Sequence, residues 1–133
     1  MEVNLKESLD DISAFVKSLP GKYFVKEYEG EYDDNDWTEK HPSCLIEISS
    51  MTPAASGADK NMIAERIDFL LLIGGNVNAQ KHPLEISSEI ISALDGQEFL
   101  LGDVSYYANF KSINFFARNK SLKIYALRWE MAK

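Results

Sequence analysis

The stretch MIAERIDFLLLIGG, residues 62–75, decides the fold of this chain. Apolar side chains occupy most of its odd positions, and the apolar run becomes continuous towards the end: Ile63, Ile67, Phe69, Leu71, Ile73. A period of two that ends in a dense apolar run predicts a long central strand of a sheet. We expect this strand to span 62–73, with Gly74-Gly75 terminating it.

The N-terminal segment predicts an amphipathic helix. Apolar residues recur there at steps of four and three, which places them on one stripe: Leu5, Leu9, Ile12, Val16, Leu19. Asn4, followed by Glu7 three residues later, is a capping box, and Pro20-Gly21 stop the helix. The helix is therefore expected at about 4–19.

Two shorter strands are expected between this helix and the central strand. Residues 22–28 are rich in aromatic and β-branched side chains, which predicts the first strand. From Ser43 the pattern alternates up to Thr52-Pro53, which predicts a half-buried second strand. Residues 53–61 hold proline, glycine, serine and three alanines, so they are expected to form a connection that bulges from the body.

The C-terminal half predicts one helix and three strands. Pro83 suits the first turn of a helix over 83–95, and Gly96 suits the left-handed position after it. Three apolar runs follow: Glu98 to Ala108, Ile113 to Ala117 and Ser121 to Met131. Arg118-Asn119-Lys120 separates the last two and predicts a tight turn.

The order of these elements predicts an α+β fold. We expect a mostly antiparallel sheet of about five to six strands, with two helices packed on one face. The 133 residues contain no internal repeat and no linker, so residues 1–133 are expected to form a single domain.

Composition favours a folded protein in a reducing compartment. The chain is 45% hydrophobic, and its single cysteine, Cys44, cannot form an intramolecular disulfide. The longest strongly apolar stretch, 69–73, is far shorter than the roughly 20 residues of a membrane-spanning helix. The start of the sequence lacks the pattern of a signal peptide. No membrane partner is therefore expected.

The negative charge is concentrated in one segment. The net charge is −7, and residues 27–40 hold seven carboxylates against one lysine, so they supply six of these charges. Binding nucleic acid through its phosphates needs clustered lysine and arginine. Direct, sequence-specific binding to nucleic acid is therefore not expected.

Residue patterns for catalysis or metal binding are weak. The only histidines, His41 and His82, each precede a proline and lie far apart, so a zinc site lacks ligands. Cys44 could pair with a histidine as a nucleophile, but its place on an apolar strand face favours a buried core residue. Residues 33–36, Asp-Asp-Asn-Asp, resemble the start of a calcium loop without its later glycine and glutamate. We expect no cofactor, no metal and no catalytic residue.

The acidic segment is the predicted partner-binding site. Its polar residues surround one aromatic side chain, a composition in which charge steers a partner and tryptophan anchors it: Glu31, Asp33, Asp34, Asp36, Trp37. The alternative is that Trp37 folds back to cover the edge of the sheet.

The chain resembles the minor tail proteins of Mu-like phages and prophages, whose fold is similar to that of tail terminators. The resemblance covers nearly the whole chain. It rests on the helices Leu5 to Leu19 and Leu84 to Leu94, and on the strands Cys44 to Ser50, Glu65 to Ile73 and Leu122 to Trp129. The acidic segment has no counterpart in the family pattern.

The resemblance implies a structural function without an active site. Members of that family form a ring that caps the tail tube, so the implied partners are other copies of the chain and other tail proteins. The implied location is the host cytoplasm or the virion tail. The competing hypothesis is a small acidic inhibitor, such as an immunity protein that blocks a basic toxin. An enzyme ranks third and would need a pocket with several carboxylates around His41 or His82.

Overall fold

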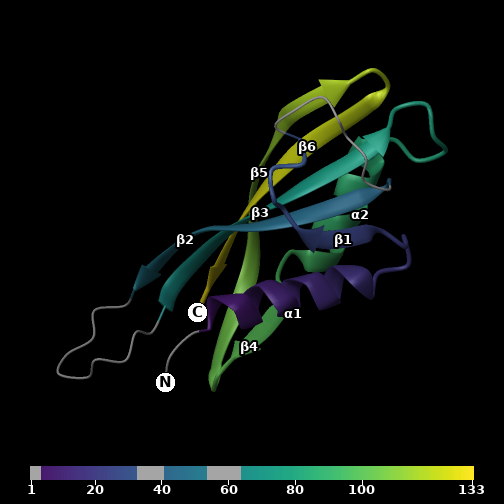
Figure 1. The fold of residues 1–133 in the computed structure, drawn as a ribbon. Coiled ribbons are helices and arrows are strands. Elements are labelled where there is room, and N and C mark those ends of the chain that lie inside the picture. The colour runs from purple at the N-terminus through teal and green to yellow at the C-terminus, as the bar shows by residue number, and fades with distance from the viewer. Residues whose placement is uncertain (1–3, 33–40, 54–63) are drawn as a thin grey trace.

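The computed structural model describes residues 4–32, 41–53 and 64–133. These residues form two helices and six strands (Figure 1). In chain order they are α1 (Leu5–Lys17), β1 (Phe24–Glu27), β2 (Ser43–Pro53), β3 (Ala64–Asn76), α2 (Pro83–Leu94), β4 (Glu98–Leu101), β5 (Val104–Asn119) and β6 (Leu122–Ala132). None of the helices in this part of the chain is long and apolar enough to cross a lipid bilayer.

The six strands form one sheet in the order β1-β2-β3-β6-β5-β4. All neighbouring strands are antiparallel except β1 and β2, which run parallel. The α+β prediction is therefore confirmed, and the sheet is mixed because of this one pair. Residues 28–42 join β1 to β2, and a connection longer than a hairpin turn allows both strands to run in the same direction.

The central strand continues through the glycines that were expected to end it. β3 pairs with β6 as far as Asn76, opposite Leu122. A Cβ atom on Gly74 would lie 2.7 Å from both Ile124 Cδ1 and Ser43 Oγ. The prediction that Gly74-Gly75 terminate the strand is wrong, because Gly74 is needed for close packing inside the sheet and not for a turn.

Both predicted helices are present, and each has a polar cap. Asn4 Oδ1 accepts a hydrogen bond from the backbone N–H of Glu7 at 3.1 Å, and α1 ends at Lys17, earlier than expected. His82 caps α2, since its Nδ1 accepts from the N–H of Leu84 at 3.1 Å. Gly96 has φ +83° after the end of α2, in the left-handed conformation that the sequence predicted.

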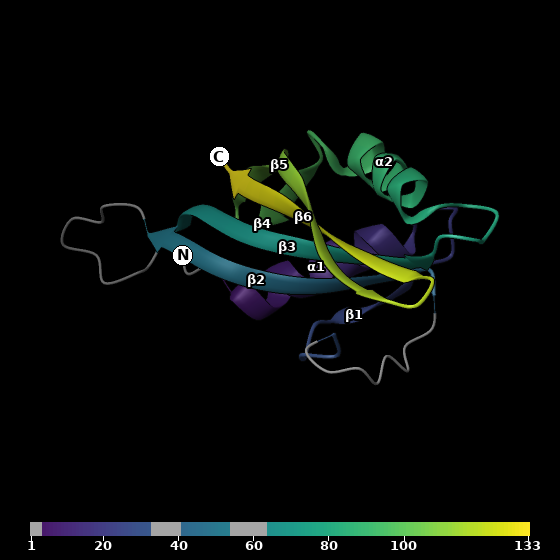
Figure 2. The same cartoon turned by 90° about the horizontal axis from the view of Figure 1, so that it is seen from above.

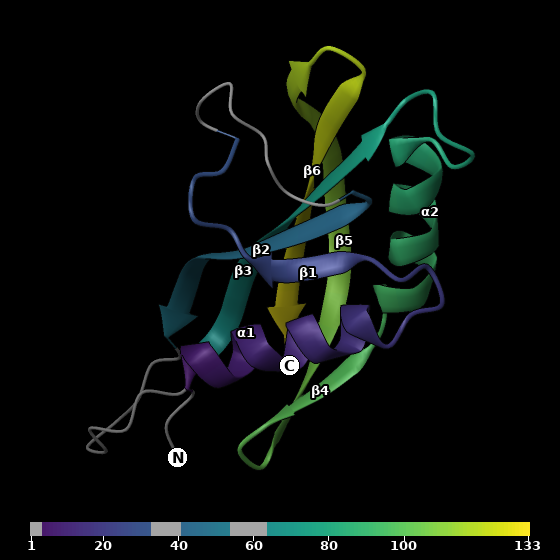
Figure 3. The ribbon, with the colours of Figure 1, turned by 45° about the vertical axis from the view of Figure 1, so that its right-hand side comes forward.

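Both helices pack on the same face of the sheet, which we call the helix-bearing face. α1 lies beneath β1 and β2, whereas α2 lies beside β6 (Figures 2 and 3). Their buried side chains join one continuous core with alternate residues of the central strands: Ile12, Val16, Ile86, Ile90, Leu94, Phe69, Leu71, Ile73, Leu127 and Trp129. The prediction that two helices cover one face is confirmed.

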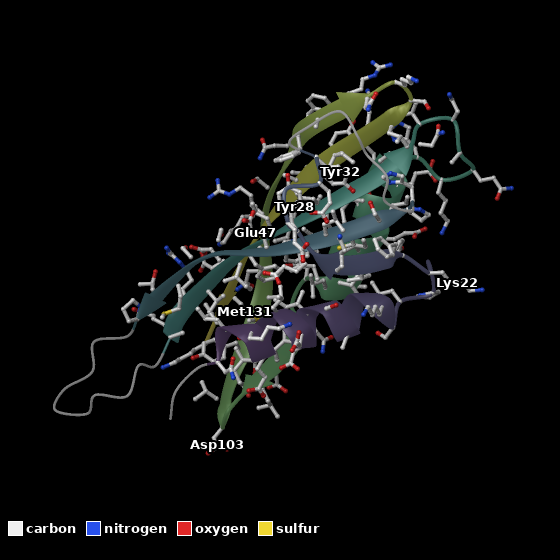
Figure 4. All side chains as sticks on the ribbon, viewed as in Figure 1. Lys22, Tyr28, Tyr32, Glu47, Asp103 and Met131 are labelled. Atoms are coloured by element: carbon white, nitrogen blue, oxygen red, sulfur yellow. The ribbon has the colours of Figure 1, made fainter. Side chains whose placement is uncertain are left out.

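A smaller cluster lies on the opposite face. It consists of Tyr32, Leu45, Leu72, Ile124 and Ala126, with Tyr28 packed against it. Figure 4 shows Tyr28 and Tyr32 on the side of the sheet away from Met131, which belongs to the main core. Residues 28–32 therefore cover part of the face that carries no helix.

The end of the chain forms two strands before the last one, but their division differs from the prediction. Glu98–Leu101 and Val104–Asn119 replace the expected runs at 98–108 and 113–117. The turn lies at Gly102, whose φ is +65°, and Lys111 is accommodated as a bulge without ending β5. A bulge lets one strand continue past an extra residue, and the sequence pattern alone cannot distinguish it from a break.

Candidate assembly surface

Of the five predicted partner-binding residues, Glu31 is the one that the structure describes. Its Oε2 lies 2.7 Å from Lys26 Nζ, and its side chain is about one tenth exposed. Burial alone would raise the pKa of this carboxyl, but the bonds from Lys26 and from backbone N–H groups hold the pKa below its usual value. Asp33, Asp34, Asp36 and Trp37 lie outside the described residues, as do positions 54–61 of the expected connection.

Aromatic stacking positions the segment 28–32 on the sheet. The rings of Tyr28 and Tyr32 are stacked with centroids 5.9 Å apart, and Tyr28 also meets Phe116 of β5 edge-on at 6.3 Å. The Tyr32 hydroxyl and Ser43 Oγ are 2.9 Å apart, and Ser43 Oγ lies 3.3 Å from His41 Nδ1. These contacts join the start of the acidic segment to β2 and to the β5–β6 hairpin.

The outer side of β5 is an open sheet edge. β4 pairs with residues 104–107, and Gly96 and Gln97 bond to Ala108. Beyond Phe110, whose N–H donates to Asp95 Oδ1, no further strand pairs with that side in the part of the chain described. We call residues 111–118 the open edge of β5. Such an edge presents unpaired N–H and C=O groups to another strand.

Large apolar side chains are exposed along this open edge. Phe115 is 59% exposed, Phe116 is 41% exposed and Ile113 is 37% exposed. Ile113 and Phe115 pair with Leu127 and Tyr125 on the helix-bearing face, beyond the cover that α2 provides. Ile113 and Phe115 are exposed on the helix-bearing face, and Phe116 meets Tyr28 on the opposite face. The open edge therefore exposes apolar side chains on both faces of the sheet, a feature that marks interaction sites.

The hairpin that carries the open edge is basic. Between Asp103 and Glu130 the sequence has no carboxylate, but it has five cations: Lys111, Arg118, Lys120, Lys123 and Arg128. Residues outside 27–40 sum to a net charge of only −1, so this separation is hidden in the total charge. The signal was present as a run of 26 residues without aspartate or glutamate.

The opposite end of the sheet carries mixed charge. There β1 is the last strand, and α1 beside it carries Glu7, Asp10 and Asp11 against Lys6 and Lys17. Burial, with the neighbouring charges of Glu7 and Asp10, raises the pKa of Asp11, which indicates crowded carboxylates. Glu27 is exposed at the end of β1. The two edges of the sheet therefore differ in charge.

A pocket of about 280 Å³ beside His41 is the place where an enzyme hypothesis could be examined. Tyr23 and Lys81 line it, and both bond Glu89: the Tyr23 hydroxyl donates at 2.9 Å, and Lys81 Nζ lies at 2.7 Å. Burial and the Glu89 bond raise the pKa of Tyr23 to about 12, so its hydroxyl holds its proton at neutral pH.

Within the described residues, the contacts at this pocket differ from those that the enzyme hypothesis required. Glu89 is the one carboxylate that these contacts bring to it, whereas the enzyme hypothesis required several around a histidine. Within the described residues, no three histidine, cysteine or acidic side chains gather to hold a metal ion. Cys44 is fully buried, and burial raises the pKa of its thiol, as expected for the core residue that the sequence predicted.

Neither a scan against models of known protein families nor a search of curated proteins finds a match to this chain.

Proposed function

We propose that the protein is a structural component of a phage or prophage tail, of the tail-terminator or tail-completion type. It acts by contacting copies of itself and the tail tube, in the host cytoplasm and then in the virion tail. The observation that carries the proposal is the open edge of β5 with its exposed apolar side chains. The resemblance to Mu-like minor tail proteins is the reason for proposing that the assembly is a phage tail.

The apolar residues of the open edge can supply useful binding energy. A phenylalanine buries about 150–250 Å² when it is fully covered, so covering the exposed 59% of Phe115 removes on the order of 100 Å² from water. At about 25 cal/mol per Å² this stabilises an interface by about 2–3 kcal/mol. Backbone pairing along residues 111–118 would add hydrogen bonds, the usual source of affinity when a strand is added to a sheet.

The acidic-inhibitor alternative has less support. An inhibitor that recognises a basic toxin by charge needs carboxylates that remain available to the partner. Glu31 already bonds Lys26 within the chain, and its side chain is mostly buried, whereas Glu27 and Glu29 of the same segment are exposed. The neighbouring genes distinguish the two hypotheses, since an inhibitor gene lies beside a toxin gene and a tail gene lies among other tail genes.

A matched pair of variants tests the proposal. Phe115→Lys removes the most exposed aromatic of the open edge, whereas Leu100→Lys changes a β4 side chain of similar exposure, 61%, away from that edge. Light scattering over a wide concentration range measures self-association, and co-sedimentation measures binding to tail tubes assembled from the neighbouring tail-tube gene.

We expect Phe115→Lys to weaken self-association or tube binding by about 30-fold to 150-fold, as a loss of about 2–3 kcal/mol requires. Leu100→Lys should leave both unchanged. A protein that stays monomeric at every concentration and does not bind tail tubes would refute the proposal.

A further inference from the structure

The two ends of the sheet have complementary outlines. At one end, β4 covers the start of β5 and leaves the open edge at 111–118. At the other end, β1 covers the start of β2, and among the described residues no strand pairs with the outer side of β2 from Glu47 onward. Each end therefore consists of one short outer strand and one recess beside a longer strand.

The short strand β1 lies at the same level as the recess beside β5, where residues at one level are those that cross-strand pairing connects across the sheet. Pairing across the sheet from Glu27 leads through Ile46, Leu71 and Leu127 to Ile113. The same path from Phe24 leads to Ala117. The four residues of β1 therefore span the level of residues 113–117, in which Phe116 is the extra residue of a second bulge. A neighbouring copy moved sideways without a shift along the strands would place its β1 beside the open edge.

The other short strand does not obstruct this arrangement. β4 pairs with β5 at residues 104–107, and Tyr107 lies level with Thr52 of β2. β4 of one copy and β1 of the next would therefore occupy different levels in the space between β5 and the neighbouring β2. Because β1 runs antiparallel to β5 within the sheet, the new pair would also be antiparallel.

Charge favours contact between unlike ends. The hairpin with the open edge, residues 104–132, carries five cations against one carboxylate, Glu130, which lies 3.7 Å from Lys111. The β1 end, residues 4–32, carries six carboxylates against four lysines. Two open edges facing each other about a two-fold axis would place Lys111 and Arg118 of both copies together. Like charges in close contact oppose such a pairing.

From this geometry we infer that a second copy of the chain occupies the open edge of β5, through its own β1 and in a head-to-tail arrangement. The inference rests on the proposed function, since it specifies how the copies associate. Head-to-tail contacts between unlike surfaces form a closed ring when the rotation from each copy to the next closes. A rotation axis parallel to the strands would keep β1 of one copy at the same level as the open edge of its neighbour.

Disulfide trapping tests the arrangement in the full-length protein. Cys44 is fully buried, so introduced cysteines can be followed without replacing it. Glu27→Cys and Ile113→Cys place thiols on the helix-bearing face at one level, and residues directly opposite in an antiparallel pair are within disulfide reach. Phe115→Cys tests a register shifted by two residues, and Ser88→Cys, on the exposed side of α2, is the control.

We expect a disulfide-linked dimer when the Glu27 variant is mixed with the Ile113 or Phe115 variant and oxidised mildly at high protein concentration. Each of these variants alone, and each mixture with the Ser88 variant, should give no such dimer. A chain that carries both Glu27→Cys and Ile113→Cys should yield a ladder of linked multimers that ends at the size of the closed ring.

Three outcomes would overturn the inference. Dimers from Ile113→Cys alone would assign a two-fold contact between β5 edges. Loss of the mixed dimer when single-stranded DNA is added, with the DNA bound to the hairpin, would assign the edge to nucleic acid. Absence of the mixed dimer while the unsubstituted protein still assembles would show that assembly uses another surface, and the proposed function would survive that result.

Discussion

The substitution Gly74→Ala probes the close packing at the centre of the sheet. The new Cβ would meet Ile124 Cδ1 and Ser43 Oγ, each at 2.7 Å, whereas ordinary contacts begin at 3.4 Å. Both neighbours are fully buried, so neither can move aside into solvent. Ser43 Oγ also bonds the Tyr32 hydroxyl at 2.9 Å, and its displacement would loosen the segment 28–32.

The expected loss of stability is about 2 kcal/mol. Overpacking of a core typically costs about 1–3 kcal/mol, and a weakened buried hydrogen bond adds about 1 kcal/mol. Alanine restricts the unfolded chain more than glycine does, which returns about 0.4–1 kcal/mol. The clash outweighs the effect on the unfolded chain, because Ile124 Cδ1 and Ser43 Oγ would both meet the new Cβ.

Gly75→Ala is the matched control on the adjacent residue. Its Cβ would meet Pro83 Cγ at 3.2 Å, a contact that a small movement of α2 relieves. We expect a change within about 1 kcal/mol, since the mild crowding and the unfolded-state effect oppose each other. Urea unfolding followed by circular dichroism measures both variants, and Gly74→Ala should lower the midpoint by about 1 M. Equal midpoints, or a larger loss for Gly75→Ala, would refute the reasoning.

Three further predictions concern single side chains. Glu31→Gln should destabilise the protein at pH 7 by about 0.5–1 kcal/mol, because the Lys26 side chain is partly exposed. The folded pKa of Glu31 is below its ordinary value of 4.5, so the carboxylate stabilises the fold above pH 4.5, and this stabilisation declines as the pH falls through the folded pKa. A urea midpoint of Glu31→Gln that differs from that of the parent equally at pH 7 and pH 3 would contradict this pH dependence. Tyr106→Phe should lower the free energy of unfolding by about 1–2 kcal/mol, because the buried Tyr106 hydroxyl donates to the backbone carbonyl of Ala64 at 2.6 Å. The control Tyr107→Phe, at an exposed position, should change the free energy of unfolding by less than about 0.5 kcal/mol. Cys44 should react with a thiol reagent only as fast as the protein opens, because burial raises the pKa of its thiol, and rapid labelling of the folded protein would contradict that expectation.

Local patterns in the sequence were enough to predict the elements and their faces. The stripe from Leu5 to Leu19 and the alternation from Ser43 depend on neighbouring residues, so they could be recognised without knowing the rest of the fold. The same holds for the burial of Cys44, whose place in an alternating strand set the face on which it lies. These predictions led to an α+β sheet with both helices on one side, as the structure has it.

Tertiary structure decided the strand order, the bulges and the edges. Gly74 resembles a turn residue in the sequence, and only the approach of Ile124 from another strand explains why the strand continues through it. The bulge at Lys111 extends β5 beyond its expected break for a similar reason, since pairing with β6 supports it. The exposure of Phe115 depends on which strands pair with β5 and where α2 ends. Such features arise from contacts between distant segments, which no local pattern contains. The acidity of the chain and the run of residues without carboxylates in the hairpin, in contrast, follow from the sequence alone.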